Sequence, residues 1–124
     1  MRKLTALIAG ASGLVGGECL QRLLASDAYS TVTVVTRRSL GSLAKHPKLR
    51  EIVVDFGRLD SVRADLRADH VFCALGTTIR KAGSRARFRQ VDFEYPLHLA
   101  QLALANGARH FSLVSALGAS SKSG

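Results

Sequence analysis

The feature that most constrains this chain is a glycine-rich segment near its start, Gly10-Ala11-Ser12-Gly13-Leu14-Val15-Gly16. A continuous apolar run, Leu4–Ala9, precedes it, and apolar residues at helical spacing follow from Leu14 onward. In a strand–turn–helix unit, Gly10 would permit the tight turn, Gly13 would let the backbone approach a pyrophosphate, and Gly16 would let the helix pack on the strand. The amides at the helix start would then face negative charge. The alternative is that the glycines serve only the turn.

The rest of the chain alternates between strand-like and helix-like segments. Apolar or β-branched runs predict further strands at 31–36, 52–54, 70–75 and 111–115, and helical spacing predicts helices at 59–66 and within 88–105. Pro96 requires the last helix to begin late, near Phe93, or to kink, and Asn106-Gly107 is a good helix stop. This alternation predicts one α/β domain over residues 1–124, a Rossmann-type doubly wound parallel sheet with strand order 3-2-1-4-5.

The end of the second predicted strand distinguishes between two cofactors. In domains that bind NAD, an acidic residue about 20 positions past the glycines holds the ribose 2′-hydroxyl, whereas an arginine accommodates the 2′-phosphate of NADP. Here Thr36 is followed by Arg37-Arg38, with no acidic residue nearby in the sequence. Guanidinium groups bind phosphate through paired hydrogen bonds. The pattern therefore predicts NADP(H); the alternative is a solvated basic turn.

Two other predicted strands end in residues suited to the same ligand, because ligands bind at the carboxyl edge of such sheets. After the third strand, we expect Asp55 to accept a hydrogen bond from the adenine amino group and Phe56 to lie near the ring. A strand-end aspartate that caps the next turn is the alternative for Asp55. After the fourth strand come Leu75, Gly76 and Thr77. Gly76 would bring the backbone against the cofactor ribose, or serve only a turn.

The chain is basic, with a formal net charge of +9, and cationic residues crowd the segment after the fourth strand. They are Arg80, Lys81, Arg85, Arg87 and Arg89. This segment favours an anionic substrate, a cofactor phosphate or a solvated surface. Nucleic acid is a weaker alternative, because the chain has no recognised nucleic-acid motif and no aromatic stacking platform.

Other classes of site find little support in the sequence. Cys19 and Cys73 are expected to be reduced core residues, and the four histidines are scattered, so no metal site is predicted. No apolar stretch approaches the roughly 20 residues that cross a bilayer. Arg2-Lys3 before an apolar run resembles a short signal peptide, but the run stops at Gly10 as a buried strand would. With no other targeting signal, the expected location is cytoplasmic.

Seven stretches together resemble a known superfamily: GASGLVG (10–16), TRR (36–38), VVDF (53–56), CALGTT (73–78), KAGS (81–84), FRQVDFEY (88–95) and HFSLVSALGAS (110–120). The chain resembles an atypical member of the extended short-chain dehydrogenase/reductase superfamily and is similar to the Tat-interacting-protein-like oxidoreductases and their bacterial relatives. The resemblance implies contacts with NADP(H) by Ser12, Gly13, Val15, Arg37, Arg38, Leu75 and Gly76. It also supports the cofactor role of Asp55 and Phe56.

The chain departs from that superfamily in its catalytic residues. Catalysis there relies on a tyrosine and a lysine four positions apart, the lysine keeping the tyrosine acidic enough to exchange a proton with the substrate. Tyr29 and Tyr95 have Thr33 and Leu99 at that distance. In relatives the pair follows soon after the segment matching SALGASSKSG, so the chain is expected to be the N-terminal part of a longer domain. Ser115 is the catalytic candidate, as the substrate-orienting serine, or else a neutral strand-end residue.

These observations lead to an expected function and two alternatives. The chain is interpreted as the NADP(H)-binding domain of an oxidoreductase or of a nucleotide-sugar-epimerase-like protein, acting on a small molecule such as a carbonyl compound or a nucleotide sugar. The first alternative is a regulator that senses NADP(H) without turnover, and the second is a basic nucleic-acid-binding module. An exposed fifth strand would also offer an edge for self-association.

Overall fold

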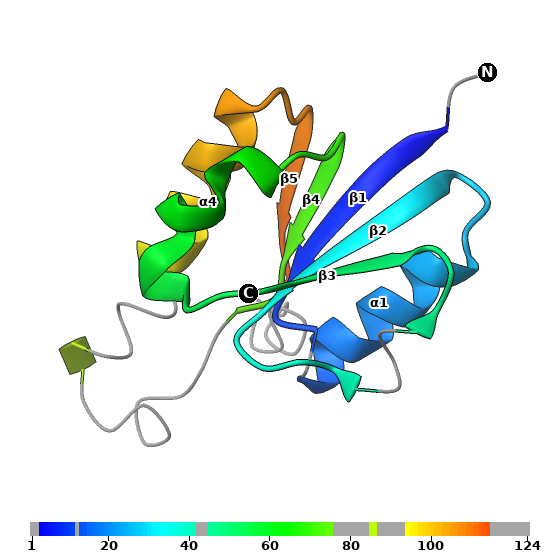
Figure 1. Cartoon of the computed structure of the whole chain (residues 1–124), viewed down its shortest axis with the longest axis horizontal. Coiled ribbons are helices and arrows are strands. Elements are labelled where there is room, and N and C mark those ends of the chain that lie inside the picture. The colour runs from blue at the N-terminus through cyan, green and yellow to red at the C-terminus, as the bar shows by residue number, and fades with distance from the viewer. Residues whose placement is uncertain (1–2, 12, 42–44, 76–84, 87–93, 115–124) are drawn as a thin grey trace, which may run out of the picture.

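The computed structural model describes residues 3–11, 13–41, 45–75, 85–86 and 94–114. Within them, five parallel strands form one sheet in the order β3-β2-β1-β4-β5 (Figure 1). In chain order the elements are β1 (Leu4–Ala9), α1 (Leu14–Ala25), β2 (Tyr29–Thr36), β3 (Leu49–Val53), η2 (Phe56–Asp65), β4 (His70–Cys73), α4 (Tyr95–Ala105) and β5 (His110–Leu113). The predicted fold class and strand order are confirmed.

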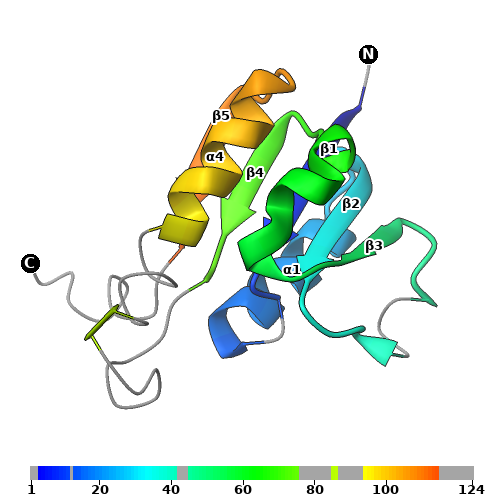
Figure 2. The ribbon, with the colours of Figure 1, turned by 60° about the vertical axis from the view of Figure 1, so that its left-hand side comes forward.

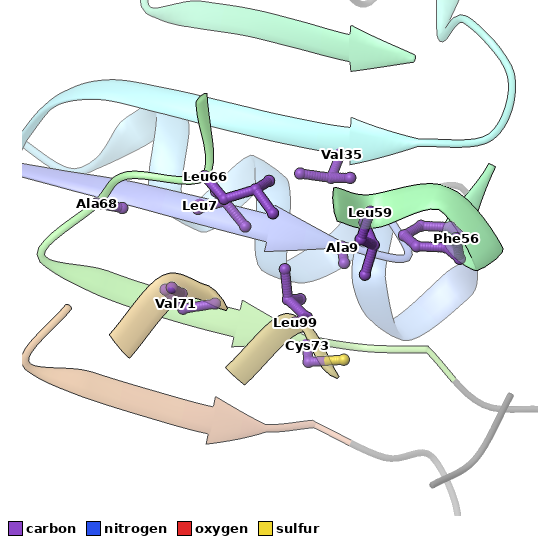
Figure 3. Close-up of a cluster of buried hydrophobic side chains, with 11 residues drawn as sticks. Leu7, Ala9, Val35, Phe56, Leu59, Leu66, Ala68, Val71, Cys73 and Leu99 are labelled. Atoms are coloured by element: carbon purple, nitrogen blue, oxygen red, sulfur yellow. The ribbon is translucent and has the colours of Figure 1, made fainter. Parts of the chain in front are cut away.

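Each face of the sheet is covered by helix. Along β1, Leu7 and Ala9 point to one face and Ala6 and Ile8 to the other, and all four are fully buried. The 3₁₀ helix η2 and α4 lie side by side over the first face (Figures 1 and 2), and their apolar residues pack with β1, β2 and β4 (Figure 3). Helix α1 covers the second face through residues that include Leu20. Burial on both sides explains why β1 has no polar residue after Thr5.

Two elements differ from the sequence prediction. β3 begins at Leu49, three residues earlier than expected, because Leu49 pairs with Val32 at the start of the ladder. β3 lies at an edge of the described sheet, and Arg50 and Glu51 interrupt its apolar residues, so the strand does not stand out as an apolar run. The expected short helix is a 3₁₀ helix that begins at Phe56, with non-helical dihedral angles at Arg58 and Val62.

The proline in the last helix is accommodated by a late start. α4 begins at Tyr95, which places Pro96 in the first turn, where its missing N–H removes no helical hydrogen bond. The helix ends at Ala105, and Gly107 adopts a φ of +98°, as a left-handed stop requires. Of the two outcomes that Pro96 allowed, a late start or a kink, the structure has the first.

The amino ends of three strands are joined through Asp69, the buried residue just before β4. Its Oδ2 accepts hydrogen bonds from the Thr5 amide at 2.9 Å and from Thr5 Oγ1 at 3.3 Å. Its backbone carbonyl accepts from the amides of Arg109, at 2.8 Å, and His110, at 3.3 Å. One residue thus links β1, β4 and the start of β5.

The two cysteines are free thiols in different surroundings. Cys73 is fully buried, and burial raises the pKa of its thiol to about 11. Cys19 is half-buried, and burial raises its pKa as well, partly offset by the positive charge of Arg22. Because the thiolate is the reactive form, neither thiol favours nucleophilic chemistry at neutral pH.

Replacement of Asp69 tests the importance of this link. We expect Asp69→Ala to lower the free energy of unfolding by roughly 1–3 kcal/mol, because the Thr5 amide loses its partner. Urea denaturation measures the change. Asp65→Ala, at an exposed position of η2, is the control and should change stability by less than about 0.5 kcal/mol. A similar small change for Asp69→Ala would contradict the structural role given to this carboxylate.

Candidate functional site

The topology singles out one place on the sheet. From β1 the chain proceeds to β2 and β3 on one side, and it then returns to β4 on the other side of β1. In open α/β sheets, ligands bind outside the carboxyl ends of the strands at such a switch point. Here the glycine turn follows β1, and Ala74 and Leu75 follow β4. The Ala74 amide donates to the carbonyl of Ala9 at 2.8 Å, so the two segments meet.

Two of the three motif glycines are required by the protein's own backbone. Gly10 has a φ of +87°, and a Cβ there would lie 2.7 Å from the carbonyl carbon and oxygen of Ala74 and 2.9 Å from the Leu75 nitrogen. A Cβ at Gly16 would collide with the carbonyl oxygen of Gly10. Gly10 therefore permits the turn against β4, and Gly16 permits the close packing of α1 on that turn.

Gly13 is different, because nothing in the described structure requires a glycine there. It is the residue before α1, with an ordinary extended φ of −83°, and a Cβ would come no closer than 3.8 Å to its nearest neighbour, the Gly10 oxygen. Gly13 is exposed, no side chain of the described residues caps the helix, and the first turn of the helix has no acidic residue. The start of α1 thus remains open to an anion from outside.

The arginine turn lies next to the glycine turn. Ala9 pairs with Val35 across β1 and β2, so the segments after these two strands begin side by side. Arg37 and Arg38 are both exposed, and within the described residues neither side chain pairs with a carboxylate. The buried Thr36 hydroxyl donates to the Arg38 carbonyl at 2.7 Å, which shapes the turn. Two arginines without a carboxylate partner in the described structure therefore lie at the edge that carries the glycine turn.

An acidic residue that is distant in the sequence reaches this turn. Glu51, in the middle of β3, accepts hydrogen bonds from the Leu40 amide at 2.6 Å and from Ser39 Oγ at 3.0 Å. The sequence near Arg37-Arg38 shows no acid, so Glu51 was missed. Its contacts depend on the register in which β3 pairs with β2, for which a single sequence carries no signal.

Asp55 and Phe56 lie at the expected edge of the sheet, and both contribute to the packing and capping of η2. Asp55 caps η2, its Oδ1 accepting from the Gly57 amide at 2.7 Å, which is the alternative left open for this residue. Phe56 is only 9% exposed and packs in the core, with its ring 6.0 Å from that of Tyr95. The packing does not support the expectation that the Phe56 ring lies beside adenine.

The remaining candidates are only partly placed. Leu75 is half-buried beside Gly10, and Val15 is half-buried in the first turn of α1; Leu14 begins that helix. Several candidates lie outside the described residues: Ser12, Gly76, Thr77 and Ser115. So does the basic segment after β4, except for Arg85, which is exposed.

The described residues provide neither a metal site nor a membrane-spanning helix. No group of three or more His, Cys, Asp or Glu side chains there could hold a metal ion. In the same ranges, no helix has the length and apolar character to cross a membrane.

The strand order, the switch point and the glycine turn define a dinucleotide-binding Rossmann domain. The chain belongs to the NAD(P)H-binding family, whose model matches residues 10–124. It is 39% identical over 125 residues to protein HTATIP2 of Rattus norvegicus. The alignment covers 99% of this chain and 51% of that protein. It is 33% identical over 123 residues to the mitochondrial protein FMP52 of Candida glabrata. The chain thus spans about half the length of the curated relatives it matches.

Solved structures agree on the fold. Uronate dehydrogenase from Agrobacterium tumefaciens superposes with a TM-score of 0.74 and 19% identity, over 93% of this chain and 41% of that one. UDP-N-acetylglucosamine 4-epimerase from Methanobrevibacter ruminantium gives a TM-score of 0.70 and 20% identity, over 90% of this chain and 37% of that one. A mutant of the uronate dehydrogenase is complexed with NAD. The chain therefore shares the fold of these proteins, in agreement with its membership of the NAD(P)H-binding family.

One expectation from the sequence is wrong. The cytoplasmic location rested on the absence of a recognisable targeting signal, yet the FMP52 relatives from Candida glabrata and Candida albicans are named mitochondrial. The fold gives the physical reason for the error: Leu4–Ala9 forms a buried strand, and nothing in a Rossmann sheet depends on the compartment.

A methyl group added at Gly16 and one added at Gly13 should have different effects, because only Gly16 lacks room for a Cβ. Gly16→Ala should lower the free energy of unfolding by more than 2 kcal/mol, about the scale of an overpacked core, because backbone must move. Gly13→Ala should leave stability within about 0.5 kcal/mol but weaken NAD(P)H binding, since the methyl group projects where the phosphate approaches. Urea denaturation and fluorescence titration measure the two effects. Full NAD(P)H affinity in the Gly13 variant would contradict a role for this glycine in cofactor binding.

Proposed function

We propose that this chain is the NADP(H)-binding part of a short-chain dehydrogenase/reductase-like oxidoreductase and that it prefers NADP(H) to NAD(H). The observation that carries this proposal is the pair Arg37-Arg38, exposed, without a carboxylate partner in the described structure, and next to the glycine turn. An acid at this position would bind the ribose 2′-hydroxyl and repel a phosphate. Glu51, the acid that reaches the turn, has both carboxylate oxygens bound to neighbouring groups.

The dinucleotide would lie along the carboxyl edge of the sheet. Its pyrophosphate would meet the open start of α1 over Gly13, with Ser12, Leu14 and Val15 lining the turn. The 2′-phosphate would bind Arg37 and Arg38. A ribose would pass the segment Leu75, Gly76 and Thr77 beyond β4, and the adenine amino group would donate to Asp55. Because Oδ1 of Asp55 caps η2, this last role falls to Oδ2.

Removal of the two arginines tests the cofactor preference. The unaltered chain should bind NADPH more tightly than NADH by about tenfold or more, since hydrogen bonds to a charged group are worth roughly 1.5–3 kcal/mol. In Arg37→Ala/Arg38→Ala the preference should disappear, while NADH affinity changes little. Isothermal titration with both cofactors measures this.

The matched control is Arg63→Ala/Arg109→Ala, which removes the same charge from two exposed positions outside the proposed site. It should retain the preference for NADPH. Equal loss in the two double variants would show that the net positive charge of +9, rather than a site, attracts the phosphate.

NADP(H) supplies hydride transfer when bound, and the protein must add a proton donor and a substrate pocket. The sequence has no tyrosine with a lysine four positions later, and Ser115 is proposed only to orient a substrate. We propose a carbonyl compound or a nucleotide sugar as the substrate class. Neighbours named uronate dehydrogenase and UDP-N-acetylglucosamine 4-epimerase support a sugar-related carbonyl. The second candidate is an NADP(H) sensor without turnover.

Binding and catalysis should therefore separate. The 124-residue chain is expected to bind NADPH. Its rate of NADPH oxidation with carbonyl compounds should be lower by a factor of about 10²–10⁴ than that of a protein expressed to the stop codon of the gene. This factor of about 10²–10⁴ is the usual contribution of acid–base catalysis. Absorbance at the NADPH band follows the reaction. Equal turnover would place the chemistry within these 124 residues. No turnover in either form, with tight NADPH binding, would favour the sensor.

A further inference from the structure

We propose that Glu51 is a positioning residue for cofactor choice: it holds the turn of residues 37–41 in the shape that presents Arg37 and Arg38 to a 2′-phosphate. This inference rests on the proposed preference for NADP(H) and adds a residue of β3 to the determinants of that preference. Glu51 would act through the backbone of the turn and would not touch the cofactor.

The turn is held at both ends by side chains. At its start, Thr36 Oγ1 donates to the Arg38 carbonyl at 2.7 Å and accepts from the Arg38 amide at 3.3 Å. At its end, the Glu51 carboxylate accepts hydrogen bonds from the Leu40 amide at 2.6 Å and from Ser39 Oγ at 3.0 Å. Thr36 and Glu51 lie on the paired strands β2 and β3, which fixes their spacing.

The hydrogen bonds of this turn in the described structure involve its backbone and the Ser39 side chain, and none of them involves an arginine side chain. Ser39 Oγ, which donates to Glu51, also accepts from the Gly41 amide at 3.2 Å, and Gly41 adopts a φ of +65°. The backbone is thus hydrogen-bonded at Arg38, Leu40 and Gly41, and Ser39 takes part through its side chain. The guanidinium groups of Arg37 and Arg38 have no carboxylate partner in the described part of the chain. The hydrogen-bonded turn therefore carries two guanidinium groups that have no carboxylate partner among the described residues.

A carboxylate near a phosphate site has two opposite effects. Its charge repels the incoming phosphate, and its hydrogen bonds order the turn before the ligand arrives, which reduces the entropy lost on binding. Because both oxygens of Glu51 accept hydrogen bonds from the turn, we infer that ordering outweighs repulsion.

The two effects separate in a pair of variants. Glu51→Gln removes the charge, but its amide can still accept from Leu40 and donate to Ser39. Glu51→Ala removes both charge and hydrogen bonds. If Glu51 positions the turn, the alanine variant should lose roughly three- to tenfold in affinity for NADPH, with NADH affinity unchanged, and the glutamine variant should retain or exceed the original NADPH affinity.

The experiment is a titration of the unaltered chain and each variant with NADPH, NADH, adenosine 2′,5′-bisphosphate and AMP. Asp65→Ala is the control for loss of one exposed negative charge, and it should leave all four affinities unchanged. Ser39→Ala keeps Glu51 and removes one of its two partners, so it should show part of the alanine effect. It also serves as the test if Glu51→Ala does not fold.

Two outcomes would overturn the inference while the unaltered chain still prefers NADPH. The first is an unchanged NADPH-to-NADH affinity ratio in Glu51→Ala and Ser39→Ala, whether both affinities stay the same or both fall equally. The second is a rise in NADPH affinity in Glu51→Ala, which would mean that repulsion dominates. Equal affinity of the unaltered chain for the two cofactors would instead overturn the proposed function, and this inference with it. The unaltered chain therefore distinguishes the two failures.

Discussion

The structure depends on the close approach of three backbone segments at the switch point. Gly10 lies against the end of β4, and Gly16 in α1 lies against the carbonyl of Gly10. Neither position has room for a side chain, so the turn, the helix and the neighbouring strand are fixed relative to one another by steric contact. The direction of α1 follows from this contact, and with it the direction of the helix dipole toward the carboxyl edge of the sheet.

Sequence reasoning succeeded wherever a local pattern determines the structure. β1 and β2 are buried on both faces, so their residues are almost all apolar or β-branched, and the glycines between β1 and α1 have steric reasons that sequence can state. The prediction was less accurate for β3, an edge strand of the described sheet in which Arg50 and Glu51 interrupt the apolar residues. The bounds of such a strand come from pairing with its neighbour, which the sequence does not display.

The candidate site was predictable in part for the same reason. Arg37 and Arg38 lie at the expected edge because strand ends converge there in any sheet of this order. The competing roles of Asp55 could be named but not resolved, because a cap and a ligand contact use the same side chain. Asp69 and Glu51 were not found, since their partners Thr5 and Leu40 are 64 and 11 residues away and only the folded sheet brings them together.

The hydrogen bonds at the amino ends of the strands have a further consequence. Besides Asp69, Lys48 Nζ donates to the carbonyls of Leu24, at 3.0 Å, and Ser26, at 2.6 Å, where α1 ends. Tyr29 and His70 join β2 to β4 through a 2.7 Å hydrogen bond at the same end. Side-chain hydrogen bonds thus link the amino ends of the strands, opposite the end of the sheet that carries the glycine and arginine turns. Evolution could exchange residues at the ligand edge, and with them the cofactor or substrate, while the linked amino ends preserve the fold.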